Sequence, residues 1–343
     1  RVATYRYYFD KVQHELTDDE ITKLATITPY AGGADMKDIV NESLVIAIRD
    51  GRETVGWADV VKAKHVKQHG LPDDHDYIER ERHAVAVHEA CHAVAAYHLR
   101  KHMTIDVATI ERRGDTGGFV SSIPPEDRFA QWRSEAEVDV ITSLASLAGE
   151  RLFFEGDHST GVGADMRAAT AMATTMLAYY AMGGSIASRT ITLATLRGAA
   201  QPAETGADRA LFDTAFGMSV EAKLKELYDR TVDLLTEHRT DVLCVAHALE
   251  THKTITGDDV EAIIEGREGT NIDGRRYRDP RFLDELERYH VACIAAHRQH
   301  GGVEGQMPIP VPPPPIGALA AVQPASGNGQ TDSREPQKQR IEE

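Results

Sequence analysis

The stretch that most constrains this chain is the apolar run at residues 84–96, which contains neither glycine nor proline. Such a run predicts an unbroken helix. Within it, residues 88–92 read H-E-A-C-H, an H-E-x-x-H pattern. On a helix, His88 and His92 lie about one turn apart on the same face, so both rings can reach one metal ion. Glu89 lies roughly 100° around the helix, where it can reach a water molecule rather than the ion.

A zinc hydrolase needs a third protein ligand and an open position for water. His98 stands where the extended pattern H-E-x-x-H-x-x-G-x-x-H places that ligand, but an alanine replaces the glycine that would end the helix. In a continuing helix, His98 lies about 240° around and about 9 Å along the axis from His92, so it cannot share the ion. Glu150 and Glu155 qualify by residue type. Asp165 follows a glycine-rich loop at a predicted helix start, where backbone can approach an ion closely. Spacing alone leaves these candidates open.

Charge and cysteine content exclude several classes of protein. The chain has 38 Lys+Arg against 54 Asp+Glu, a net charge of −16, and no long basic block, which argues against a nucleic-acid partner. Its 3 cysteines are far apart and predict no disulfide framework, which fits a reducing compartment. We interpret Cys91, between the two histidines, as a packing residue.

No apolar run is long enough to span a membrane, and the start shows no signal peptide. The missing initiator Met suggests a piece of a longer protein, so a membrane would be reached only through segments absent from this chain.

The hydrophobic pattern predicts a mainly α fold in four regions. Residues 1–75 predict a small helical bundle, with a capping box at 17–20 and helices beginning at 33 and 57. Residues 76–265 hold the motif helix and a β-like stretch at 104–110. A glycine-rich turn at 114–118 follows, so we expect a hairpin or an exposed edge strand. The remaining helices are predicted at 134–154, 164–181, 219–238, 240–251 and 256–265. Residues 266–300 predict a helical extension with its last helix at 280–298, and residues 301–343 a proline-rich, disordered tail.

Several of these segments resemble the FtsH-type ATP-dependent zinc metalloproteases. Residues 87–94 are similar to the H-E-A-G-H-A signature of that family, with Cys91 in place of glycine. Residues 109–119 resemble its edge strand and turn, residues 124–128 its P-E-E-D-R segment, and residues 220–264 its closing helices. Residues 147–150 stand where the family has G-G-R or A-G-R, so Glu150 is a departure. Residues 159–170 are similar to the stretch whose aspartate is the third zinc ligand. The resemblance therefore implies Asp165 as that ligand.

A second resemblance lies upstream. Residues 32–43 are similar to the G-A-D-L-x-x-L-V-N-E-A helix of the AAA ATPase lid, whose turn, here Gly33 and Ala34, would touch nucleotide in the full-length parent. The chain contains no G-x-x-x-x-G-K-[ST] phosphate loop, so it cannot hydrolyse ATP on its own. The resemblance thus implies a helical AAA lid at 1–75 followed by a zincin-like peptidase domain at 76–265. ATP and Mg²⁺ would act only in the parent.

Together, these expectations predict a zinc-dependent endopeptidase that cleaves unfolded or threaded proteins. Zn²⁺ would be held by His88, His92 and Asp165, with Glu89 as the base. The strand ending at Thr109 and Ile110 would be the platform on which an extended substrate adds.

The resemblance further implies a homo-hexamer. It also implies a location at the cytoplasmic face of a membrane if the parent has an anchor, and otherwise in the cytoplasm. The alternative is a non-proteolytic scaffold or quality-control adaptor with a structural zinc site. Cys91, Glu150 and the proline-rich tail keep this alternative open, but a structural site has no use for Glu89.

Overall fold

The computed structural model describes residues 1–73, 76–113, 116–126, 128–186, 215–269 and 271–310. The fold is mainly α, as predicted. The N-terminal helices are α1 (Val2–Phe9), α2 (Asp18–Thr26), α3 (Gly33–Arg49) and α4 (Trp57–His69). They are followed by α5 (Glu79–Leu99), α6 (Arg133–Phe153), α7 (Gly163–Ala178), α9 (Ala215–Glu237), α10 (Arg239–His252), α11 (Gly257–Glu265) and α12 (Pro280–Gln299). The strands are β1 (Thr104–Thr109), β2 (Phe119–Ile123) and β3 (Thr254–Thr256), with 3-10 turns η1 (Thr160–Val162) and η3 (Gly274–Arg278).

The N-terminal helices enclose an apolar core of their own. Tyr5 and Phe9 of α1 are buried in this core with residues of α2, α3 and α4. The capping box predicted at the start of α2 is present: the Thr17 side chain accepts a hydrogen bond from the Glu20 backbone, and the Glu20 carboxylate accepts one from the Thr17 backbone. Both bonds satisfy amide groups that have no partner within the helix, which fixes where α2 begins.

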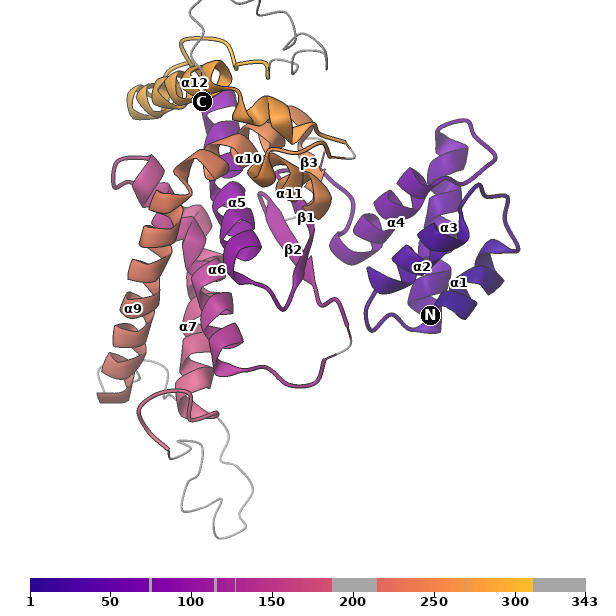
Figure 1. Ribbon diagram of the computed structural model, residues 1–343, viewed down its shortest axis with the longest axis horizontal. Helices are drawn as coiled ribbons and strands as arrows, with labels where there is room; N and C mark the ends of the chain where they lie inside the picture. The colour runs from indigo at the N-terminus through magenta and orange to yellow at the C-terminus, as the bar shows by residue number, and fades with distance from the viewer. Residues whose placement is uncertain (74–75, 114–115, 127, 187–214, 270, 311–343) are drawn as a thin grey trace, which may run out of the picture. The chain divides into compact units, whose positions relative to one another are not determined.

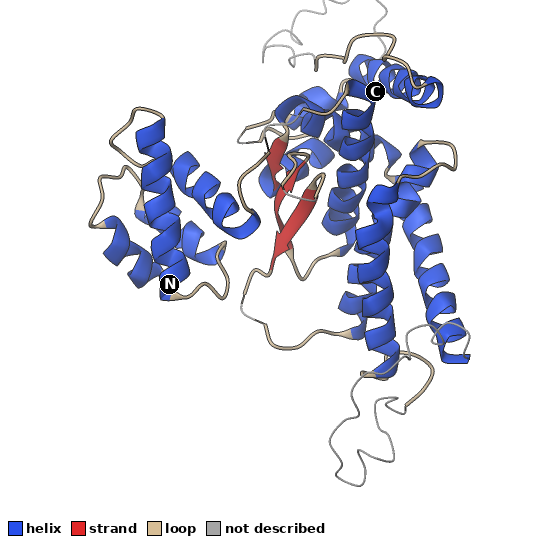
Figure 2. Cartoon of the chain, turned by 180° about the vertical axis from the view of Figure 1, so that it is seen from behind, coloured by secondary structure: helices blue, strands red, loops and turns tan. Residues whose placement is uncertain are grey.

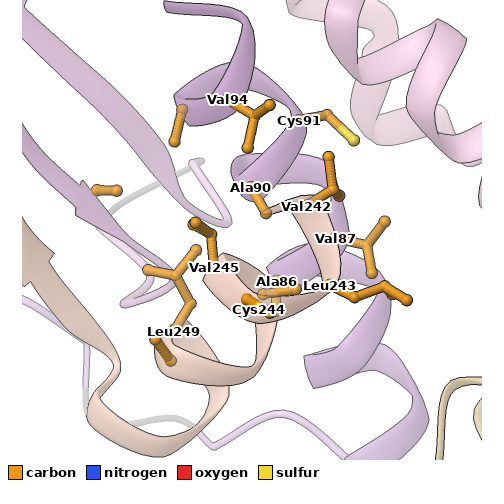
Figure 3. Close-up of a cluster of buried hydrophobic side chains, with 14 of the residues drawn as sticks. Ala86, Val87, Ala90, Cys91, Val94, Val242, Leu243, Cys244, Val245 and Leu249 are labelled. Carbon is orange, nitrogen blue, oxygen red and sulfur yellow. The ribbon is translucent and has the colours of Figure 1, made fainter. Parts of the chain in front are cut away.

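Helix α5 is the centre of the following region. It packs against α10, α6 and β1, and in both views it lies between the group formed by α6, α7 and α9 and the small sheet (Figures 1 and 2). Small side chains such as Ala86 and Ala90 face Val242 and Val245 of α10 in a fully buried cluster (Figure 3). Because α5 is enclosed by these neighbours, the H-E-x-x-H motif that it carries is held in a fixed position.

The sheet corrects one prediction. Strands β1 and β2 form the expected antiparallel hairpin, but the strand order is β2-β1-β3, so β1 is the central strand. Thr109 pairs with Phe119 of β2 on one side and with Thr254 of β3 on the other. Of the two expected alternatives for β1, a hairpin or an exposed edge strand, the hairpin is present, and β2 rather than β1 lies at the edge of the sheet. The three residues of β3 are too few to show an alternating pattern, so sequence reasoning missed this strand.

No helix among the described residues is long and apolar enough to cross a membrane. The last predicted helix is present as α12. The disorder predicted for the tail falls mostly on residues 311–343, which lie outside the described residues.

Cys91 is fully buried where α5 touches α6, as its interpretation as a packing residue requires. Its partner is Gly149 of α6: a Cβ atom added at Gly149 would lie 2.2 Å from the Cys91 sulfur and 2.9 Å from the Cys91 Cβ. The contact leaves no room for a side chain on α6. The cysteine that replaces the family's glycine thus fits against a glycine on the facing helix.

This contact predicts a coupled pair of substitutions. Gly149→Ala should destabilise the protein by about 1–3 kcal/mol, because the added methyl group overpacks the helix contact. In the Cys91→Gly background the same substitution should cost much less, because the obstructing side chain is gone. Urea unfolding of the four proteins in this cycle measures the coupling. Gly33→Ala is the matched control, since a Cβ there meets nothing within 4 Å. Equal effects of Gly149→Ala in both backgrounds would contradict the prediction.

Candidate metal centre and active site

The two histidines of the motif are brought together by α5 itself. His88 and His92 lie one turn apart, with ring centroids 5.1 Å from each other, and both line a cavity of about 930 Å³. The helix runs unbroken through the motif from Glu79 to Leu99. The expected position of the two imidazoles on one face is therefore found.

Asp165 reaches these imidazoles from the first turn of α7. Its Oδ2 atom lies 3.3 Å from His88 Nε2 and 3.4 Å from His92 Nε2. The Ser146 hydroxyl of α6 donates a 2.8 Å hydrogen bond to the same oxygen. The short turn η1 lies directly before α7, so this aspartate follows a turn that lines the same cavity. Ligand atoms of the three residues all lie within 4.8 Å of one another.

The structure separates the other third-ligand candidates from this group. Glu155 follows the end of α6 in a left-handed backbone conformation and pairs with Arg298. His98 lies in the last turn of α5 and contacts Asp241 of α10, 3.3 Å away, as expected if α5 continues past the motif. Glu150 is close to the histidines but takes a different position from Asp165.

Glu150 makes a contact with His88 that sequence reasoning missed. Its Oε1 atom lies 2.7 Å from Nδ1 of His88, and Ser159 donates to it from both its backbone amide and its hydroxyl. Burial raises the pKa of Glu150, but these hydrogen bonds outweigh that effect and lower it. An ionised Glu150 holds the proton of His88 on Nδ1 and leaves Nε2 free as a ligand atom. The sequence signal was present, because a carboxylate replaced the usual arginine, but only packing reveals its partner.

The second imidazole is oriented in the same manner. His92 Nδ1 lies 2.7 Å from the Thr142 carbonyl oxygen of α6. A carbonyl only accepts, so Nδ1 carries the proton and Nε2 again faces Asp165. Two imidazole nitrogens and one carboxylate oxygen form a donor set suited to zinc, and each imidazole has the outer hydrogen bond that metal-binding histidines make. The residues present therefore fit a zinc ion.

The electrostatics of the group favour a cation. Burial lowers the pKa of His88, but hydrogen bonds to Asp165 and Glu150 outweigh it and raise that pKa to about 10. Burial likewise opposes ionisation of Asp165, yet its bonds to the two histidines hold its pKa well below the usual range. The negative potential that retains a proton on His88 also attracts a metal cation to the same place.

Glu89 lies beside the group of His88, His92 and Asp165 but is not part of it. It is only 4% exposed, and its Oε2 atom has no hydrogen-bond partner among the residues that the structure describes. Burial raises its pKa, and the nearby His88 only partly offsets this. Gly118, before β2, packs directly on it: a Cβ there would lie 2.8 Å from Glu89 Oε1. An unpartnered buried carboxylate with a raised pKa, at the wall of a cavity, can accept a proton near neutral pH.

The residues predicted as substrate platform and as nucleotide contact add no ligand to this centre. Thr109 lies beside it: a Cβ atom at Gly118 would be 2.7 Å from the Thr109 carbonyl oxygen and 2.8 Å from Glu89 Oε1. Thr109 and Ile110, the predicted substrate platform, are buried, and both are hydrogen-bonded to Lys253 beside β3. They therefore offer no free edge. Gly33 and Ala34 begin α3 and are exposed there.

Comparison with known proteins agrees with this geometry. The family model described as "Peptidase family M41" matches residues 76–263. The chain is 33% identical over 249 residues to "ATP-dependent zinc metalloprotease FtsH 2" of Sphaerobacter thermophilus, which covers 71% of this chain and 36% of that protein. It is 30% identical over 247 residues to the protein of the same name in Symbiobacterium thermophilum, covering 71% and 41%. It is 27% identical over 270 residues to "ATP-dependent zinc metalloprotease YME1L1" of Mus musculus, covering 78% and 36%.

The chain thus spans between 36% and 41% of the length of these relatives. The family model, by contrast, matches more than half of the chain, and its range includes the motif helix, Glu150 and Asp165. This chain belongs to peptidase family M41.

Proposed function

We propose that this chain is the zinc-dependent endopeptidase part of an ATP-dependent protease. The observation that carries the proposal is the convergence of His88, His92 and Asp165 beside the buried, unpartnered carboxylate of Glu89. The family match and the names of the relatives support the same activity and the same cofactor. The scaffold alternative is not favoured, because the chain matches a peptidase family and keeps a base that a structural site does not need.

The roles of the side chains follow from their positions. When bound by His88, His92 and Asp165, Zn²⁺ would supply Lewis-acid chemistry to water and to the scissile carbonyl. Glu89 accepts the proton that the attacking water loses and gives it to the leaving amine. Glu150 keeps the ring of His88 in its tautomer and orientation throughout.

The free edge of β2 is the better platform for substrate. Within the described part of the chain β2 pairs only with β1, and Gly117, Phe119 and Val120 line the cavity that contains Glu89. An extended peptide added to this edge would be held by main-chain hydrogen bonds beside the base. Such binding does not depend on side chains, so cleavage would be weakly selective for sequence.

The remaining features belong to the longer parent. We assign residues 1–75 to an AAA-type lid, 76–265 to the peptidase domain, 266–300 to a helical extension and 301–343 to a proline-rich tail. In the parent, Gly33 and Ala34 would contact ATP with Mg²⁺, and an ATPase ring would feed unfolded proteins to a hexamer. The parent would lie at the cytoplasmic face of a membrane if it has an anchor, and otherwise in the cytoplasm.

A chelation experiment tests the proposed activity. The zinc-loaded chain should cleave a short unfolded polypeptide without ATP, because the chemistry needs no nucleotide. Removal of zinc with 1,10-phenanthroline should stop cleavage, and added Zn²⁺ should restore it. Cleavage that persists after the metal is removed, or no cleavage by the fully zinc-loaded chain, would contradict the proposal.

A further inference from the structure

Helix α12 lies outside the range that the peptidase family model matches, yet its last turn lines the catalytic cavity. The matched range ends at residue 263, and α12 begins at Pro280. His297, in the last turn of α12, and His300, directly after it, line the cavity of about 930 Å³ that contains the motif. The metal centre and the base make no use of either side chain. The extension therefore adds to the cavity a wall that the zinc chemistry does not require.

Buried polar contacts fix α12 against the motif helix. His83 of α5 lies between two partners: its Nδ1 atom is 2.6 Å from Oε1 of Glu250 on α10, and its Nε2 atom is 2.8 Å from Nδ1 of His290 on α12. The Tyr289 hydroxyl, also on α12, donates a 3.0 Å hydrogen bond to the other carboxylate oxygen of Glu250. All four side chains are buried. Separating α12 would leave buried donors and acceptors without partners, which is costly, so α12 is a fixed wall of the cavity.

The end of α12 is attached at the cavity itself. The Arg80 side chain, near the start of α5, donates a 2.8 Å hydrogen bond from Nη1 to the carbonyl oxygen of Gly301. His297 Nε2 lies 3.4 Å from a carboxylate oxygen of Asp157, in the loop after α6. Arg80, Asp157 and His297 all line the cavity. The wall is therefore joined both to α5 and to that loop.

Apolar side chains line the cavity at this end. Phe154, directly after α6, packs against imidazole rings from α5 and α12: its ring centroid lies 6.3 Å from that of His83 and 5.8 Å from that of His297. Ala84 and Val85 of α5 are half-buried and line the same cavity. An apolar side chain of a ligand that leaves water against such a surface is stabilised there.

Charged side chains of both signs lie beside this apolar surface. Arg80 and Glu81 are adjacent in α5, and Asp157 faces His297. Mixed charges of this kind give little preference for an ionic side chain of either sign. The surface therefore fits an apolar side chain better than a charged one.

The distance of this surface from the metal centre follows from α5. The residues of α5 that line the cavity include those at positions 80, 81, 84, 85, 88, 89 and 92, which recur along one face of the helix. His88 and Arg80 are eight residues apart, which is about 12 Å along the axis. An extended peptide rises about 3.3 Å per residue. About three or four substrate residues therefore separate the metal centre from the surface beside α12.

We propose that Val85, Phe154 and His297 form a substrate subsite, which takes an apolar side chain three or four residues away from the scissile bond. The proposal rests on the proposed peptidase function, because it needs a peptide held at the metal centre. Main-chain pairing with β2 selects little by sequence, whereas this subsite adds a preference at one position. His297 comes from the extension, so the matched peptidase range lacks this part of the subsite.

Peptide hydroxamates test the subsite without any need for cleavage. A hydroxamate binds zinc through its two oxygens, so it anchors one end of a peptide at the metal centre. Two series of fluorescent alanine peptides carry the hydroxamate at the C-terminal or at the N-terminal end, with leucine at one position at a time. In one series, leucine at the third or fourth residue should bind the zinc-loaded 343-residue chain about tenfold more tightly than alanine, the ratio expected if about half of its extra carbons leave water. Fluorescence anisotropy measures each Kd.

The ratio of the alanine and leucine Kd values is then compared between proteins. His297→Ala should lower this ratio to about threefold or less, because it opens one side of the subsite, and Phe154→Ala should abolish it. Phe154 is buried, so circular dichroism checks that its variant is folded, whereas the His297 side chain is 43% exposed and gives an independent test. Gln299→Ala is the matched control and should keep the wild-type ratio, because Gln299 is exposed near the end of the same helix and does not line the cavity.

The outcomes separate this subsite from the metal centre. Equal ratios in wild type and His297→Ala would overturn the subsite and leave the metal centre in place. So would a loss of the preference in Gln299→Ala equal to that in His297→Ala. Failure of every hydroxamate peptide to bind the zinc-loaded chain would contradict the metal centre itself, and with it both proposals.

Discussion

Replacing Glu89 with glutamine is expected to reduce peptide hydrolysis by about 10²–10⁴-fold, the usual contribution of a general base. Glutamine has nearly the same shape, so it fits the space against Gly118, but it cannot accept the proton from water. Zinc content should stay at the wild-type level, because Glu89 is not among the ligands. Steady-state cleavage of an unfolded peptide, together with elemental analysis, measures both quantities.

The control for this change lies on the same helix. Glu81 is exposed near the start of α5 and lines the same cavity. Glu81→Gln removes the same charge from the cavity wall but leaves the base in place, so activity should remain near wild type. If Glu89→Gln kept near-wild-type activity, Glu89 would not be the base.

Replacing Asp165 with alanine is expected to release zinc from the catalytic site. The loss of an outer partner of a ligand commonly costs about 10–100-fold in metal affinity, and the loss of a ligand itself should cost more. Affinity should therefore fall at least about 100-fold, and hydrolysis should be lost with the metal. Competition with a zinc-binding dye measures the affinity.

Two further variants give zinc affinities with which that of Asp165→Ala can be compared. Glu150→Gln keeps every ligand and removes only the charge behind His88, so its zinc affinity should fall by about 10–100-fold, between wild type and Asp165→Ala. Asp157→Ala removes an exposed carboxylate from the same cavity and should leave affinity unchanged. An unchanged metal load in Asp165→Ala would move the third ligand elsewhere.

Local sequence patterns correctly predicted the features that depend only on neighbouring residues. The helices follow from apolar spacing and capping, and the rejection of His98 as a catalytic ligand follows from helical geometry alone. The choice of Asp165 did not follow from spacing, because it depends on how α7 packs beside α5. Only the resemblance to a family named it in advance, and the structure brings it to the two imidazoles.

Two features could not be predicted from the sequence, because each depends on contacts between residues far apart in the chain. Strand β3 pairs with β1 across a separation of 145 residues at Thr109 and Thr254, and no local pattern reports such a partner. Thr109 and Ile110 were therefore assigned to a free edge that does not exist. Glu150 was recognised as unusual, but its role depends on the contact between α5 and α6.

Because Cys91 is buried between α5 and α6, the reactivity of its thiol reports how often these two helices separate. Thiol reagents attack the thiolate, and burial raises the pKa of this thiol well above its ordinary value. Labelling therefore requires α5 and α6 to part at Gly149, which is a local opening with its own free energy. With Cys244 and Cys293 replaced by alanine, the labelling rate of Cys91 would measure how often the motif helix separates from α6. That frequency could be followed with and without zinc, in the absence of any substrate.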